Sequence, residues 1–285
     1  MNKVSLTVFA SMAGILALGA CSKDSLPVYS HLDSLRVLAL IANTPEVTPG
    51  ASLIITPYIS DPLGAGRALK FSARGCPDPG VAAGARPTCL GQATTVTIAD
   101  QQAVTLPVAS NSYTGSVNTF SVAIPAAALV GQSSMASYNG VSYLVTYDLV
   151  SSDGASVSSF KRIVVSSGAK PANQNPSVTD ILSAGGSLNA ASLAPSTVVP
   201  MAAVIPASSA ETYTYQDSGG SVISATESLL VTWFSNTGDF KYIRTNFLGD
   251  ANTFTPGSAP VGGHPTFVVV VRDGRGGEAI FQKNF

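Results

Sequence analysis

The sequence has few charged residues and few of the side chains that usually carry out catalysis. Lys, Arg, Asp and Glu make up 11% of the 285 residues, and the formal net charge is −1, which excludes the basic surface typical of nucleic-acid binding. Only two histidines occur, His31 and His264, and no G-x-S-x-G nucleophile motif is present. The sequence therefore predicts no catalytic residue and favours a protein that is not an enzyme.

Long apolar runs are also scarce, and the only one lies at the N-terminus. Val4 to Ala17 carries no charge and follows Lys3, the pattern of a secretory signal rather than of a comfortable bilayer span. No later run is long enough to predict a membrane-spanning helix. The chain is therefore expected to be exported, with any membrane attachment near its N-terminus.

The apolar run ends in LGAC, Leu18 to Cys21, which resembles the lipobox of bacterial lipoproteins. The resemblance implies that residues 1–20 are a cleaved signal peptide and that the Cys21 thiol receives lipid, palmitate included. Two or three acyl chains on one residue hold a protein firmly to a bilayer. Ser22 follows the cysteine in place of the aspartate associated with inner-membrane retention, so the resemblance implies attachment to the cell outer membrane through a tether over residues 21–34.

Two cysteines remain, Cys76 and Cys89. A pair close in sequence in an oxidising compartment predicts a disulfide. Two cysteines without a neighbouring histidine make a poor zinc site, so we expect no bound metal there. The intervening segment PDPGVAAGARPT is a loop by composition, with almost no apolar residue to anchor it.

Most of the remaining pattern predicts strands, because it is rich in Val, Ile, Thr, Tyr and Leu between turn-forming residues. In the first half the expected strands are Arg36–Ile41, Ser52–Ser60, Thr95–Ile98, Asn118–Ile124, Ser142–Val150 and Val157–Val165. The only helix-like stretch, Pro125 to Val130, is long enough for a single connecting turn.

A second set of expected strands follows SSGAKPANQNPS, Ser166 to Ser177, a linker by composition. These strands are Val178–Leu182, Thr197–Ile205, Glu211–Tyr215, Ser228–Phe234, Tyr242–Thr245 and Phe267–Val271. The sequence therefore predicts an all-β chain of two tandem β-sandwich domains, over residues 35–167 and 178–285, joined by a linker at 168–177.

Both halves end in an apolar strand, an Asp-Gly dipeptide and a returning strand. Asp153-Gly154 and Asp273-Gly274 are strong hairpin signals, because glycine accepts the positive φ that such turns need. The second of these, VVVVRDGRGG, also suggests a phosphate cradle. That reading requires a helix after the glycines, and EAIFQKNF does not predict one.

These hairpins resemble the last two strands of PKD-like and other immunoglobulin-like domains of bacterial surface proteins. The resemblance extends to VTWFSNTGDF, Val231 to Phe240, and to ISDPLGAGRALKF, Ile59 to Phe71. It implies two immunoglobulin-like sandwiches, with Trp233 in the core of the second and Phe71 in the equivalent place of the first.

Several aspartates lie in predicted turns, where bonding to the local backbone explains them. Calcium held at the domain junction is the alternative, since carboxylates and loop carbonyls at the ends of sandwiches can form an oxygen cage. The aspartates show no dense repeat, and we expect neither a metal nor a cofactor. They are Asp61, Asp153, Asp239, Asp250 and Asp273.

The leading hypothesis is an envelope lipoprotein that binds or adheres to a protein or glycan partner through sandwich loops. The loop between Cys76 and Cys89 is the expected contact surface. The alternatives are a structural spacer of the cell envelope and a hydrolase whose site the sequence does not reveal. The expected contacts are the membrane, through the lipid, and an unidentified envelope component, without nucleic acid.

Overall fold

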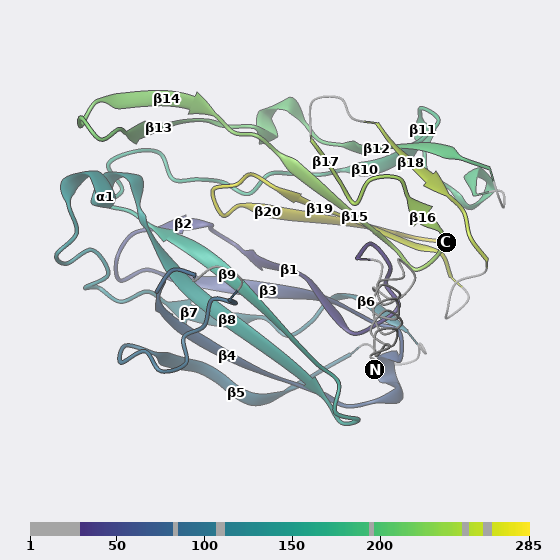
Figure 1. The fold of residues 1–285 in the computed structure, drawn as a ribbon, viewed down its shortest axis with the longest axis horizontal. Coiled ribbons are helices and arrows are strands. Elements are labelled where there is room, and N and C mark those ends of the chain that lie inside the picture. The colour runs from purple at the N-terminus through teal and green to yellow at the C-terminus, as the bar shows by residue number, and fades with distance from the viewer. Residues whose placement is uncertain (1–28, 82–84, 107–111, 194–196, 247–250, 259–263) are drawn as a thin grey trace, which may run out of the picture.

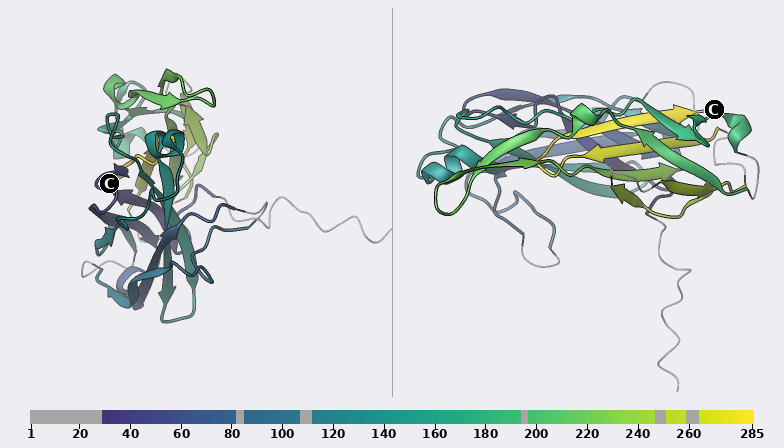
Figure 2. Two further views of the ribbon diagram at one scale, coloured as in Figure 1. Left: turned by 90° about the vertical axis from the view of Figure 1, so that its left-hand side faces the viewer. Right: turned by 90° about the horizontal axis from the view of Figure 1, so that it is seen from above.

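The computed structural model describes residues 29–81, 85–106, 112–193, 197–246, 251–258 and 264–285. The chain is all-β, as predicted, and four of its sheets stack as successive layers, here numbered I to IV (Figure 1). Sheets I and II form the first sheet pair and sheets III and IV the second. Seen end-on, the second pair lies above the first (Figure 2).

The first sheet pair contains the strands up to residue 165. Sheet I has the order β2 (Glu46–Val47), β9 (Ser156–Val165), β8 (Val141–Ser151), β4 (Leu69–Pro77), β5 (Val96–Val104). Sheet II has the order β1 (Arg36–Ala42), β3 (Ser52–Asp61), β6 (Tyr113–Ser116), and β7 (Phe120–Ala123) also pairs with β3.

The second sheet pair begins at residue 180. Sheet III has the order β17 (Arg244–Asn246), β15 (Leu230–Ser235), β19 (Thr266–Arg272), β20 (Glu278–Asn284). Sheet IV has the order β11 (Gly186–Ser187), β10 (Asp180–Ser183), β12 (Val199–Val204), β18 (Asn252–Thr255), β16 (Asp239–Phe240). A separate hairpin consists of β13 (Thr212–Gln216) and β14 (Val222–Thr226).

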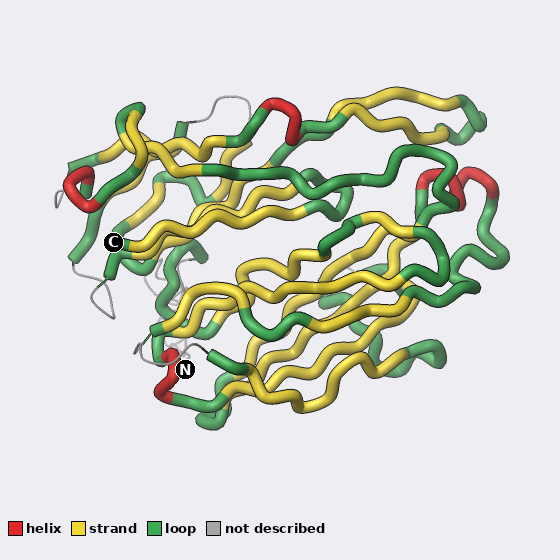
Figure 3. The backbone as a smooth tube through the Cα atoms, turned by 180° about the vertical axis from the view of Figure 1, so that it is seen from behind, coloured by secondary structure: helices red, strands yellow, loops and turns green. Residues whose placement is uncertain are grey.

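Helices are few and short (Figure 3). Within the described residues the one α-helix is α1 (Ser134–Asn139), which begins after Ser133, whose hydroxyl accepts from the Ala136 N–H. Pro125 to Val130, expected to form no more than a connecting turn, forms successive hydrogen-bonded turns. Short 3₁₀ turns cover Gly64–Gly66, Ala190–Ser192 and Ala207–Ser209.

Each sheet pair buries its own apolar core. Between sheets I and II the ring of Phe71 stacks on Tyr147, with centroids 5.2 Å apart. Between sheets III and IV, Trp233 is 1% exposed and donates its indole N–H to Thr245 Oγ1 at 2.9 Å. The predicted core positions of Phe71 and Trp233 are therefore confirmed. The domain boundaries at 35–167 and 178–285 stay predictions.

A third apolar layer joins sheet II to sheet III. Leu38 of β1 packs with Phe234 of β15 and with Val268 and Val270 of β19, while Val269 and Val271 face the core between sheets III and IV. The run VVVV is continuous because both faces of β19 are buried. This seam holds the two sheet pairs side by side along their strands (Figure 1).

The predicted Asp-Gly hairpins are confirmed, since β8 pairs with β9 and β19 with β20 in antiparallel register. The second turn has a further role, because Asp273 and Arg275 make contacts between the sheet pairs. We refer to this group of contacts, which also includes Asn173, Glu46 and Glu227, as the joint. The Asp273 carboxylate is buried and accepts from the backbone N–H groups of Arg275 and Gly277 and from Asn173 Nδ2. A Cβ on Gly277 would overlap that carboxylate, so the glycine is required for close packing.

Buried charges complete this joint. Arg275 pairs with Glu227 at 2.8 Å and with Glu46 at 3.4 Å, and both of these carboxylate side chains are 1% exposed. Burial raises the pKa of Glu227. Burial would do the same to Glu46, but hydrogen bonds, the largest from Lys170, outweigh it and lower the pKa of that group.

Two further contacts fix the halves together. The β13–β14 hairpin reaches α1, where Asn139 donates to the Gln216 carbonyl and accepts from the Gln216 N–H. The last residues of the predicted tether pack against sheet III: Leu32 donates to the Ser235 carbonyl and is 3% exposed, and Tyr29 contacts the ring of Phe234. Residues 29–34 therefore form part of the folded body.

Candidate functional site

The predicted disulfide is present. Cys76, near the end of β4, is bonded to Cys89, and both are fully buried. Their sulfurs pack on Leu144 of β8, which lies on the outer face of sheet I. The bond therefore fixes the loop that it closes against the outermost layer of the protein.

The loop is anchored more firmly than its composition predicts. Asp78 pairs with Arg162 of β9, and its N–H donates to the Ser142 carbonyl at 3.0 Å. Pro87 is buried, whereas Val81 is 47% exposed. The expectation of a loop without an apolar anchor is wrong, because two cysteines and a proline supply one.

A groove of about 290 Å³ lies beside this loop, on the outer face of sheet I. The lining residues come from the loop's returning segment and from β8 and β9: Arg86, Pro87, Thr88, Leu90, Thr146, Asp148, Ser158, Ser159 and Phe160. We refer to it as the loop groove.

The floor of the loop groove follows from strand register. Thr146 lies opposite Phe160, and Asp148 lies opposite Ser158. Residues two apart on a strand share a face, so these four side chains form two adjacent rows. The ring of Phe160 is 41% exposed and has the Arg162 guanidinium 5.1 Å from its centroid. The floor therefore offers hydroxyls, a carboxylate and an aromatic ring.

The charges around the loop groove do not balance. Asp148 pairs with Arg74 at 3.6 Å, and Asp78 pairs with Arg162. Arg86 is exposed and makes no hydrogen bond or ion pair within the described part of the chain. One guanidinium is therefore available to a ligand.

A larger cavity, of about 420 Å³, opens between the two sheet pairs. Its lining includes Asn236, His264 and Gln282. The Asn236 side-chain amide donates to the His264 carbonyl and accepts from the Thr266 N–H. The Gln282 side-chain amide donates to the Thr114 carbonyl. These amides already serve to hold the structure together, so the loop groove is the stronger candidate for binding.

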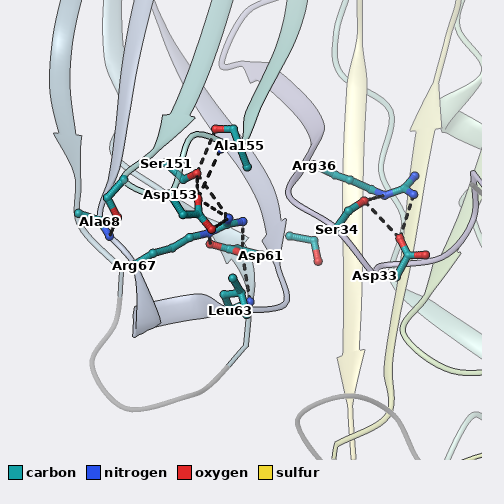
Figure 4. Close-up of polar contacts among 12 residues, drawn as sticks. Asp33, Ser34, Arg36, Asp61, Leu63, Arg67, Ala68, Ser151, Asp153 and Ala155 are labelled. Atoms are coloured by element: carbon teal, nitrogen blue, oxygen red, sulfur yellow. Dashed lines mark hydrogen bonds and ion pairs between the residues drawn. The ribbon is translucent and has the colours of Figure 1, made fainter.

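Asp61, which also lines the larger cavity, is neutralised within a cluster at one end of the first sheet pair (Figure 4). Arg67 bridges Asp61 at 2.9 Å and Asp153 at 2.7 Å. A hydrogen bond from Ser151, followed by the contacts with Arg67, lowers the pKa of Asp153 to about 2. The same carboxylates raise the pKa of Arg67.

The other candidate calcium ligands are dispersed. Asp239 bonds His31 at 2.9 Å, Asp273 lies in the joint, and Asp250 lies outside the described residues. Within the described ranges, no group of three or more His, Cys, Asp and Glu side chains is placed to hold a metal ion. The structure does not bring these aspartates together in one site.

The two histidines occupy separate structural positions. His31 Nε2 contacts the Asp239 carboxylate, and His264 Nδ1 contacts the Phe285 backbone oxygen at 3.0 Å. The first holds residues 29–34 on the second sheet pair, and the second lies beside the larger cavity. Each ring therefore has a local contact that explains its position.

Comparison of the sequence with protein-family models and with curated proteins finds no match. Cys21, the predicted lipidation residue, lies outside the described residues. In the part of the chain that the structure describes, none of the helices has the length and apolar character needed to cross a membrane.

Proposed function

We propose that this protein is an envelope lipoprotein that binds a partner at the loop groove and does not catalyse a reaction. The observation that supports binding most directly is Arg86, which has no partner among the described residues, beside an open row of polar side chains and the exposed ring of Phe160. Ligand sites typically combine an aromatic surface with a few placed polar groups. The disulfide holds the loop in place, which lowers the entropy lost on binding.

The membrane anchor in this proposal is Cys21, on the strength of the lipobox resemblance, and the location is the outer membrane. Residues 29–34 bind sheet III, so the segment that carries the lipid would join the folded body at the second sheet pair. The loop groove lies on sheet I, two layers away in the stack. The loop groove and the point where the anchoring segment joins the folded body therefore lie on different sheet pairs. PKD-like and immunoglobulin-like folds for the two sheet pairs belong to the same proposal.

The test of the anchor is Cys21→Ser. The variant is expected in the soluble fraction without incorporating labelled palmitate, whereas the wild type incorporates it and sediments with membranes. Unchanged labelling and membrane association would contradict lipidation.

The test of binding replaces residues 81–87 with a glycine-serine segment and retains Cys76 and Cys89. Crosslinking in intact envelopes followed by purification is expected to recover less partner than the wild type does, while the melting temperature changes little because the disulfide remains. Unaltered recovery would contradict the assignment of binding to this loop.

A structural spacer is the second candidate, and the continuous four-layer stack favours it. The apolar seam, the Arg275–Glu46 pair and the Asn139–Gln216 hydrogen bonds connect the two sheet pairs at separate places. A spacer depends on this rigidity and not on the groove. Loosening the joint with Arg275→Ala should then impair function in the cell, while replacing residues 81–87 should not.

A further inference from the structure

We infer that the loop groove takes a terminal acidic sugar of an envelope glycan, with the sugar carboxylate bound by Arg86. This inference rests on the proposed function, because it names the ligand class of the same site. Three properties of the groove support it: its charge, its hydroxyl groups and its size.

The charge of the groove favours an anion. The two nearby carboxylates, Asp148 and Asp78, already have arginine partners in Arg74 and Arg162. Arg86 is left without a partner among the described residues. A guanidinium presents a planar set of donors that matches a carboxylate in bidentate geometry, so a ligand carboxylate completes the local charge balance.

The remaining polar groups favour a sugar over an apolar side chain. Thr146 and Ser158 line the groove, and their hydroxyls make no hydrogen bond within the described residues. A hydroxyl both donates and accepts, as do the hydroxyls of a sugar. The exposed ring of Phe160, directly across the strands from Thr146, offers an apolar surface for the C–H face of the ring.

The size of the groove favours one unit of a polymer. About 290 Å³ lies just below the range of about 300–1,000 Å³ that is typical of complete small-molecule sites. The groove is formed at the surface of sheet I by β8, β9 and the disulfide loop. A single sugar at the end of a glycan fills such a site while the rest of the chain extends into solvent.

The experiment uses the lipidated full-length protein in detergent and three immobilised probes. These are a tetrasaccharide ending in glucuronic acid, the same tetrasaccharide ending in glucose, and an Asp/Glu-rich peptide of matched charge. The variants are Arg86→Ala, Arg86→Lys and Lys241→Ala, the last removing an exposed lysine from the second sheet pair.

The acidic tetrasaccharide is expected to bind more tightly than its neutral counterpart. Arg86→Ala should weaken that binding by about 10- to 100-fold, the loss expected for a charged hydrogen-bonding partner. Arg86→Lys should retain part of the affinity, because it keeps the charge but not the bidentate geometry. Lys241→Ala should leave it unchanged.

Equal binding of the acidic and neutral sugars, or acidic binding that survives Arg86→Ala, would overturn the inference. Arg86-dependent binding of the acidic peptide in place of the sugar would assign the groove to a protein partner and leave the proposed function standing. If none of the probes binds, the sugar assignment fails. If replacing residues 81–87 also leaves partner recovery from envelopes unaltered, the proposed binding site fails with it.

Discussion

Arg275 and Glu46 are separated by 229 positions in the sequence and form an ion pair 3.4 Å long between the two sheet pairs. The same guanidinium lies 4.1 Å from the ring centroid of Tyr213 and pairs with Glu227. A turn that the sequence predicts only as a hairpin therefore also joins segments from both halves of the chain.

Arg275→Ala is expected to lower the free energy of unfolding by about 3 kcal/mol, because it leaves the buried Glu227 carboxylate without a cation. Glu46 keeps its pair with Lys170, which limits the loss. Urea unfolding measures the change. Lys241→Ala is the control, with an expected effect below about 0.5 kcal/mol for an exposed residue. An Arg275→Ala effect as small as the control's would contradict a stabilising joint.

Asp153→Asn is expected to make the free energy of unfolding depend less on pH in the acidic range. Bonding to Ser151 and Arg67 lowers the pKa of Asp153 from 3.8 to about 2 in the folded state. A lowered carboxyl pKa gives stability that is present above the unfolded value and is lost as pH falls from about 4 to about 2. The variant should be less stable than the wild type at about pH 7 and should lose less on acidification. Urea unfolding across this pH window checks it, and parallel curves would contradict the Arg67 cluster.

Two carboxyl groups of the joint, Asp273 and Glu227, are expected to change stability with pH in the opposite direction to Asp153. Burial raises the pKa of Asp273 and of Glu227, so their contribution to stability falls as pH rises through the folded-state values. Asp273→Asn is therefore expected to reduce the amount by which the free energy of unfolding falls as pH rises through the folded-state pKa of Asp273. The unfolding free energies of variant and wild type, measured over the same pH series, check the sign. A steeper loss in the variant would contradict it.

Trp233→Ala is expected to cost about 3–5 kcal/mol, because the indole is fully enclosed between sheets III and IV. Trp233→Phe should cost less, since it keeps an aromatic ring and loses mainly the hydrogen bond to Thr245. Trp233 is the only tryptophan, so its fluorescence reports on this core directly. A water-like emission maximum that iodide quenches strongly would show that the indole is not buried.

Replacing both Cys76 and Cys89 with serine is expected to lower stability by about 3 kcal/mol in the chain-entropy model, given the sequence separation of 13. Urea unfolding of the variant should match that of the reduced wild type. Non-reducing peptide mapping provides the covalent evidence. Free thiols at both positions in the mature protein would contradict the disulfide.

The strands that the sequence predicts best are those with β-branched runs. The expected strands at Arg36–Ile41 and Phe267–Val271 correspond to β1 and β19. β4 was not predicted, because LKFSARGCP mixes charged and small residues with only a few apolar ones. It becomes a central strand through pairing with β5 and β8, and such tertiary context is not visible in a local pattern.

The candidate site could be predicted only in part. Local composition and cysteine spacing give the disulfide loop. The groove depends on Phe160 and Asp148, which β8 and β9 place beside residue 86. The alternating polar pattern of SVSSF in β9 is ordinary for an exposed sheet face. What distinguishes these residues is the loop that lies against them, and only the folded structure shows that contact.

Photocrosslinking in intact envelopes tests the central claim most directly. Benzoylphenylalanine placed at Phe160, 41% exposed in the loop groove, is compared with the same group at Tyr242, 45% exposed on the second sheet pair. The proposed function predicts a discrete crosslinked product from position 160 that is lost with Arg86→Ala, and no such product from position 242. Equal labelling from both positions, or no discrete product from position 160, would contradict a binding site at the loop groove, and a product at 160 that persists in Arg86→Ala would contradict the role of Arg86.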